Sequence, residues 1–113
     1  MAERRVEWTA EARDDLLQVV DFIAFDDPLT AQRILDRLRL RALSLDRFAE
    51  RGRVVPELRG TRFRQHRELV VTPWRIFYTI DKNVVRVIAL FDGRRDPREL
   101  LHDRFARASI RSR

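Results

Sequence analysis

Hydrophobic and polar side chains alternate near the middle of the chain. From Trp74 to Ile80 every second residue is apolar, which is the period of a β-strand that buries one face. Apolar runs rich in β-branched residues lie on either side, at about 66–71 and 84–91. Turn-forming residues separate the three runs. The pattern predicts three consecutive antiparallel strands arranged as a meander.

Short turns set the expected register of these strands. A two-residue loop at Lys82-Asn83 would join the last two, and a tight turn at Thr72-Pro73 would join the first two. The expected cross-strand pairs are Thr79 with Arg86, Phe77 with Ile88, Arg75 with Leu90, Val70 with Arg75 and Glu68 with Phe77. This register leaves one face apolar and places Arg75 on the other face, diagonal to Glu68.

Two segments before the meander carry apolar residues at helical spacing, over residues 10–25 and 28–46. Thr9 can cap the first helix, and Asp27 followed by a proline predicts the start of the second. Because the link between them is so short, the helices should form an antiparallel hairpin. A short strand is expected before them, at residues 4–8. The surface available to the hairpin is the face that bears Trp74, Ile76, Tyr78 and Ile80.

The remaining segments complete a single α+β domain over residues 1–113. Gly52 is a candidate cap for the end of the second helix. Residues 53–65 show no regular period, and residues 97–108 predict a short C-terminal helix. We therefore expect a strand and a helical hairpin packed on one face of an antiparallel β-meander, followed by that short helix.

Charge is unevenly distributed along the chain. Residues 1–50 carry 8 basic and 11 acidic side chains, whereas residues 51–113 carry 16 and 7. The first part therefore has a net charge of −3 and the second of +9, which together give the chain +6. A strongly basic second part favours a polyanion or an acidic protein as partner.

Arg75 is the most informative charged residue, because it interrupts an otherwise apolar strand. An arginine in such a position usually has a carboxylate or phosphate partner. A cross-strand pair with Glu68 and a dedicated phosphate-binding role both fit the pattern. Further arginines that could form a basic edge beside the sheet are Arg59, Arg62, Arg64, Arg67, Arg94 and Arg95.

Strong signatures of catalysis or of a cofactor are missing from the sequence. It contains no cysteine, no Gly-rich phosphate loop, no metal-spaced histidine pair and no nucleophilic serine elbow. We therefore predict neither a metal nor a cofactor. The chain also has no long apolar run and no signal-like N-terminus, so the cytoplasm is the expected location and no membrane contact is predicted.

Three runs in the second half of the chain are more specific. They are Gly52-Arg53-Val54-Val55-Pro56-Glu57-Leu58, Arg67-Glu68-Leu69 and Trp74-Arg75-Ile76-Phe77-Tyr78. In this order they resemble the RelE/ParE superfamily, the toxins of type II toxin–antitoxin modules, and in particular its ParE-like, plasmid-stabilisation branch. The resemblance extends from Val6 to Asp96. It implies a strand, a helical hairpin and a three-stranded meander, the same order as the hydrophobic pattern.

Two activities are known within this superfamily. RelE-like members cut mRNA on the ribosome, using a strand arginine, further basic residues and often a C-terminal tyrosine or histidine. Arg75 matches the strand arginine, but the tyrosine would fall near Leu101, and the chain has no tyrosine after Tyr78. ParE-like members instead inhibit DNA gyrase by binding. The resemblance thus implies a gyrase inhibitor, with a metal-independent mRNA endonuclease as the alternative.

The resemblance also implies functional residues and a cognate antitoxin. Residues expected to bind the target or a phosphate are Arg59, Arg62, Arg64, Arg67, Arg75, Arg94 and Arg95. If the protein is a ribonuclease, the catalytic candidates are Arg75, Glu68 and Arg95. An antitoxin is expected on the sheet face opposite the helices, at Val70, Arg75, Phe77, Arg86, Ile88 and Leu90.

Overall fold

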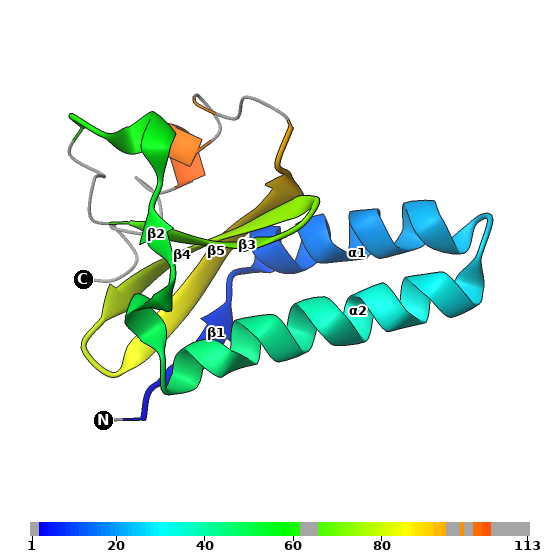
Figure 1. The fold of residues 1–113 in the computed structure, drawn as a ribbon, viewed down its shortest axis with the longest axis horizontal. Helices are drawn as coiled ribbons and strands as arrows, with labels where there is room; N and C mark the ends of the chain where they lie inside the picture. Colours follow the sequence, from blue (N-terminus) through cyan, green and yellow to red (C-terminus); the bar gives the residue numbers. More distant parts are fainter. Residues whose placement is uncertain (1–2, 62–65, 95–97, 99–100, 105–113) are drawn as a thin grey trace.

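The computed structural model describes residues 3–61, 66–94, 98 and 101–104, and it places two long helices against one sheet (Figure 1). The chain begins with β1 (Arg5–Trp8), α1 (Ala10–Ala24) and α2 (Pro28–Leu43). Short elements follow: η1 (Ser44–Asp46), η2 (Ala49–Arg51), β2 (Arg53–Val54) and η3 (Pro56–Leu58). The meander consists of β3 (Arg67–Val71), β4 (Trp74–Asp81) and β5 (Val84–Asp92).

The five strands form one sheet in the order β1-β5-β4-β3-β2. β1 lies parallel to β5, and the other neighbouring strands are antiparallel. The predicted α+β architecture is confirmed, including the short C-terminal helix, which contains residues 101–104. The sequence pattern does not predict β2, because a strand of two residues carries no detectable period. Within the described ranges, no helix is long and apolar enough to cross a membrane.

Both long helices begin where their capping residues predict. The Thr9 side chain accepts a hydrogen bond from the backbone N–H of Ala12, and Asp27 accepts one from Thr30. Each bond satisfies a donor that the first helical turn leaves without an intrahelical partner. The hydrogen bonds from Thr30 also hold the pKa of Asp27 below its usual value. α1 and α2 form the expected hairpin, whose far end extends beyond the sheet (Figure 1).

The hairpin packs on the predicted face of β4. Ile76 and Tyr78 are fully buried, and Trp74 and Ile80 pack against the same cluster. The other buried members come from the helices and the sheet: Ala12, Leu16, Leu38, Ala42, Leu45, Ala49, Leu69, Val71, Val85, Val87 and Leu90. The burial of this apolar surface is the main favourable contribution to the stability of the fold.

The predicted register of β4 and β5 is wrong on one side of a β-bulge, which interrupts their ladder between Phe77 and Tyr78. The observed pairs include Thr79 with Arg86, Phe77 with Ala89 and Arg75 with Phe91. The first pair confirms the prediction, whereas the other two are displaced by one residue because β5 carries an extra residue at the bulge. Leu90 consequently packs in the helix-facing core and not on the opposite face. The predicted β3–β4 pairs, Val70 with Arg75 and Glu68 with Phe77, are confirmed.

The second face of the sheet is covered, although the sequence predicts an open surface there. Phe77, Ile88, Ala89 and Phe91 are buried in a second apolar cluster. The residues that cover them are Val55, Leu58 and, from the C-terminal helix, Leu101. The rings of Phe77 and Phe91 lie 5.8 Å apart at an interplanar angle of 53°. The chain therefore supplies its own cover for much of the expected apolar patch.

Candidate functional site

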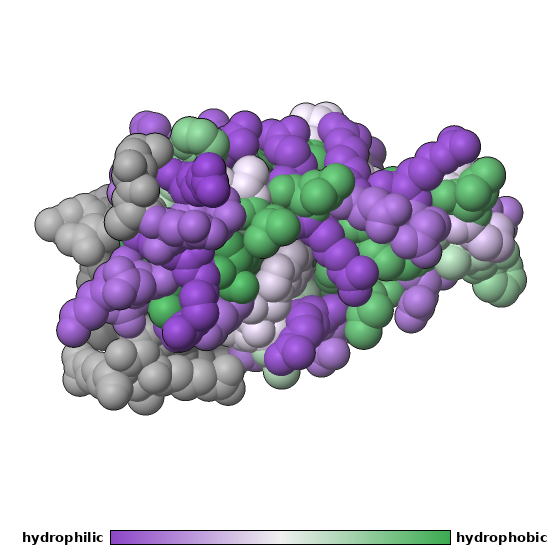
Figure 2. Space-filling model, turned by 90° about the horizontal axis from the view of Figure 1, so that it is seen from below, coloured by the Kyte–Doolittle hydropathy of each residue, from purple (hydrophilic) through white to green (hydrophobic). Residues whose placement is uncertain are grey.

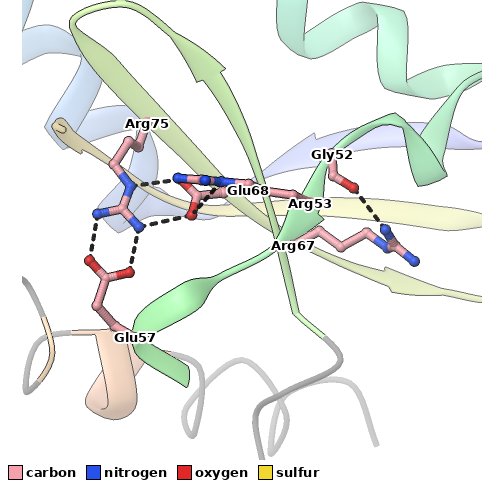
Figure 3. Close-up of polar contacts among 6 residues, drawn as sticks. All are labelled: Gly52, Arg53, Glu57, Arg67, Glu68 and Arg75. Atoms are coloured by element: carbon pink, nitrogen blue, oxygen red, sulfur yellow. Dashed lines mark hydrogen bonds and ion pairs between the residues drawn. The ribbon is translucent and has the colours of Figure 1, made fainter. Parts of the chain in front are cut away.

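Arg75 lies at the centre of a charged cluster (Figure 3), and Phe77 of the second apolar cluster lies beside it. Arg75 extends from β4, and only 7% of its surface is exposed. Its Nε donates to Glu68 Oε1 at 2.6 Å, and one Nη donates to Glu68 Oε2 at 2.8 Å. Both Nη atoms also donate to Glu57, at 2.7 and 2.6 Å. Two carboxylates thus hold the guanidinium along two edges, each through a bidentate pair.

Different elements supply the two carboxylates. Glu68 is on β3, is 1% exposed and pairs diagonally with Arg75 as the sequence predicts. Glu57 belongs to η3, which the buried side chain of Leu58 anchors in the second apolar cluster. Arg75 also lies over the ring of Phe77, with 5.0 Å between its Cζ and the ring centroid. The position of the Arg75 side chain is therefore held both by packing on Phe77 and by ion pairs with the two glutamates.

The charges of this cluster balance. Arg53 Nε approaches Glu68 to 3.4 Å, so two arginines face two carboxylates. The hydrogen bonds from Arg75 hold the pKa of Glu57 below its usual value. The hydrogen bonds to Glu57 and then to Glu68 in turn raise the pKa of Arg75. Because two carboxylates match the two arginines, these four side chains together carry no net charge.

A cavity of about 380 Å³ opens beside the cluster. The residues that line it are Arg53, Pro56, Glu57, Val70, Thr72, Pro73, Arg75, Gly93 and Arg94. Arg94 is 84% exposed and donates to Asp92 at 2.6 and 3.0 Å, and this bond raises the pKa of Arg94. The arginines around this cavity are therefore already paired, and its apolar part comes mainly from Val70 and the two prolines.

Tyr78 links the connection after α2 to the sheet through two hydrogen bonds. Its buried hydroxyl accepts a bond from the backbone N–H of Gly52 at 3.0 Å and donates to the Ala49 carbonyl at 2.7 Å. Burial raises the pKa of this hydroxyl. A Cβ on Gly52 would lie 2.3 Å from the Tyr78 oxygen, and the Gly52 backbone is extended. Gly52 is thus needed for close packing, and its predicted role as the cap of the second helix is wrong.

The other arginines of the predicted basic edge are dispersed. Arg67 donates to the Gly52 carbonyl at 2.7 Å and points away from Arg75 (Figure 3). Arg59 is exposed on the connection before β3. The predicted target-binding residues Arg62, Arg64 and Arg95 lie outside the described residues. The structure thus brings Arg75 together with Glu68, and it does not gather the arginines that it describes into one phosphate-binding group.

The residues expected to bind an antitoxin fall into two groups, one buried and one at least partly accessible. Phe77 and Ile88 are buried in the second apolar cluster, and Leu90 faces the helices, so a partner cannot reach these three in this conformation. Arg86 approaches Glu7 of β1 to 3.6 Å. Val70 is 42% exposed. For Val70 and Arg86 a contact with an antitoxin stays a prediction.

Two ion pairs are missed by sequence reasoning. Glu57 lies within one of the runs that carry the family resemblance, but its partner is 18 positions away. Asp15 of α1 accepts the backbone N–H of Leu90 at 3.0 Å and forms an ion pair with Arg104, 89 positions along the chain. The position of Asp15 beside the core residue Leu16 is the one signal that could have found it. Arg104 also covers the ring of Phe91, 5.2 Å from its centroid.

Comparison with known sequences gives a family. Residues 6–97 match the family described as the ParE toxin of the type II toxin–antitoxin system parDE. The toxin RelE2 of Caulobacter vibrioides is 36% identical over 87 residues, which are 76% of this chain and 91% of that protein.

Solved structures agree on the fold. A protein of the chromosomal ParDE system of P. aeruginosa has a TM-score of 0.66 at 16% identity, over 80% of this chain and 96% of that one. A protein of the RelBE2 toxin–antitoxin complex of Mycobacterium tuberculosis has a TM-score of 0.61 at 22% identity, over 81% and 93%. These two structural similarities support the fold. The evidence for the family is the sequence match over residues 6–97. The chain belongs to the ParE toxin family of type II toxin–antitoxin systems, within the RelE/ParE superfamily.

Proposed function

We propose that this toxin inhibits growth by binding DNA gyrase and that a cognate antitoxin neutralises it. The observation that carries the proposal is the double carboxylate clamp on Arg75. In an mRNA endonuclease this strand arginine would have to stabilise the charge that develops on a phosphate. Here Glu57 and Glu68 occupy the guanidinium edges that would bind it. The cluster is therefore better suited to holding the fold than to RNA chemistry.

The tyrosine that RelE-like members often use for proton transfer is not available among the described residues, which leaves Glu68, His66 and His102 as the candidates. Cleavage through a 2′-hydroxyl needs one group that takes a proton and one that gives it. The single tyrosine, Tyr78, is buried, and its hydroxyl already accepts one hydrogen bond and donates another. Leu101, near which the resemblance places a C-terminal tyrosine, is a buried apolar residue. These features support an activity that depends on binding.

The alternative is a ribosome-dependent mRNA endonuclease. The name of the Caulobacter relative, toxin RelE2, favours it. This activity would require Glu57 to release one edge of Arg75 when RNA binds. Arg75, Glu68 and Arg95 would then be the catalytic candidates.

An antitoxin partner is supported by the two structural neighbours, both of which come from toxin–antitoxin systems. Apolar side chains that are more than half exposed gather on the hairpin and just after it: Leu17, Phe22, Phe25, Leu29, Leu40, Leu43 and Phe48. Figure 2 shows hydrophobic surface at the far end of the hairpin, on the right, and along the side of the molecule. Exposed apolar surface of this kind is typical of a protein that spends its time in a complex.

Induced expression with two parallel readouts tests the target. A gyrase inhibitor should cause DNA double-strand breaks and altered supercoiling while bulk mRNA stays intact. Rapid codon-linked cleavage of mRNA on ribosomes would reject gyrase and establish the alternative. Co-expression of the protein encoded by the neighbouring reading frame should restore growth under either activity, and failure to restore it would count against an antitoxin role for that protein.

A further inference from the structure

The outer edge of β1 is not paired with another strand. β1 ends the strand order, with β5 on its inner side. Arg5 and Thr9 donate their backbone N–H groups to carbonyl oxygens on the β5 side, at 2.8 and 3.0 Å. Because the direction of the N–H groups alternates along a strand, those of Val6 and Trp8 point toward the outer edge. On that side Arg4 already donates its backbone N–H to the Asp46 carbonyl at 2.8 Å, so the part of the edge that can accept one more strand runs from Val6 to Trp8.

A groove lies directly beside this edge. It is a cavity of about 510 Å³ lined by Glu7 and Trp8 of β1, Arg13 and Leu16 of α1, and Arg39 of α2. Trp8 and Leu16 give it an apolar part, and both pack against the helix-facing core. The groove is therefore built by three elements that the core holds in place.

The charge of the groove is positive. Within the part of the chain that the structure describes, the guanidinium groups of Arg13 and Arg39 have no ion-pair or hydrogen-bond partner, and both residues are exposed. The carboxylate of Glu7 is already matched, because Arg5 lies 3.1 Å and Arg86 3.6 Å from it. The two arginines of α1 and α2 are thus available to carboxylates from outside, unlike Arg75.

We propose that an acidic, extended segment of the antitoxin docks in this groove. It adds a strand to the outer edge of β1, seats an apolar side chain against Trp8 and Leu16, and places carboxylates beside Arg13 and Arg39. Backbone hydrogen bonds and the apolar contact hold the segment, while the charges speed its encounter and fix its register. This inference rests on the antitoxin proposed above and moves its docking site from the covered sheet face to the β1 edge.

A charge-reversal pair of variants tests the groove. The probe is the purified protein encoded by the neighbouring reading frame, titrated against the full-length toxin. The double variant Arg13→Glu/Arg39→Glu should bind it about tenfold or more weakly, because two attractive contacts become repulsive. The matched control Arg33→Glu/Arg37→Glu makes the same change at exposed α2 positions outside the groove, and its affinity should stay within about twofold. Equal thermal unfolding midpoints would show that both variants fold.

Hydrogen exchange supplies the second measurement. The backbone amides of Val6 and Trp8 should exchange more slowly in the complex than in the free toxin. Unchanged exchange at β1, equal affinity of the two double variants, or protection confined to the far end of the hairpin would each overturn the inference and leave the proposed function intact. A probe that neither binds nor restores growth would overturn both.

Discussion

At the scale of single residues, Arg75 belongs to the structure as much as to any site. It is the partner of a glutamate, Glu68, that is 1% exposed. We predict that Arg75→Ala lowers the free energy of unfolding by about 3–5 kcal/mol, because it leaves that carboxylate buried without its bidentate partner. Urea unfolding of the purified variant measures this. Arg94→Ala, which breaks an exposed ion pair, should leave the urea midpoint nearly unchanged.

This prediction affects how toxicity data should be interpreted. Replacing a strand arginine is an obvious test for a phosphate-binding role. If Arg75→Ala unfolds the protein, a loss of toxicity reports folding and says nothing about phosphate. A fully stable Arg75→Ala variant would contradict the structural role and would reopen the endonuclease alternative.

The pKa of Glu57 predicts a response to acid. Glutamate ordinarily titrates near 4.5, and the hydrogen bonds from Arg75 lower that value in the folded protein. The unfolded chain therefore takes up the proton first as the pH falls. The stability that the clamp contributes is complete above the pKa of Glu57 in the unfolded chain. It is lost as the pH falls through the lower pKa of Glu57 in the folded protein. Glu57→Gln should remove this dependence.

Thermal unfolding of the two proteins over a pH series checks it. The wild-type advantage over Glu57→Gln should be constant from pH about 7 down to about 5 and should then shrink in more acidic buffer. An advantage that is independent of pH would show that the charge of Glu57 adds nothing to stability.

At the scale of elements, local pattern predicts most of the fold. The helices need a period of 3.6 residues, two capping side chains and a proline, all of which are local in sequence. The same holds for the alternation in β4. Thr9, Asp27 and the Trp74–Ile80 stripe therefore lead to the right elements in the right order, and the apolar stripe predicts which face the hairpin covers.

What the sequence does not predict depends on long-range contacts. A β-bulge has no local signature in a run as apolar as Val84–Asp92, so Leu90 is assigned to the wrong face. The cover over Phe77 comes from segments on both sides of the meander, η3 and the C-terminal helix. Asp15 pairs with Arg104, which lies 89 positions further along the chain. For these reasons the site is predicted as an open arginine face, whereas it is covered and charge-balanced.

The C-terminal helix is a test at this scale. Leu101 is fully buried against the second face of the sheet. We predict that Leu101→Ala costs about 2–5 kcal/mol of unfolding free energy, through lost burial and the cavity left behind. Phe25→Ala, at a side chain that is 91% exposed, should cost almost nothing in the same urea assay. Similar midpoints for both variants would mean that this helix is not part of the core.

At the scale of the molecule, charge should govern the rate at which partners meet. The chain carries +6, and the excess lies in its second part. For an acidic antitoxin we predict that raising the salt concentration slows association far more than it speeds release, because screening acts mainly on the encounter. Stopped-flow association and dissociation rates over a salt series measure both. A release rate that rises as steeply as the association rate falls would point to an interface held chiefly by ion pairs.

The bulge in β5 has a consequence for insertions and deletions. The strand holds one residue more than its partner β4 requires, and Ile88 and Ala89 consequently share a face. Deleting Ala89 should convert the ladder into a regular one while Leu90 and Phe91 keep their present faces. Deleting Thr79 from β4 should instead leave β5 with two surplus residues. We therefore expect the deletion in β5 to lower the thermal unfolding midpoint much less than the deletion in β4. The register that alternation alone predicts, with Phe77 opposite Ile88, would then be the native register of a chain one residue shorter.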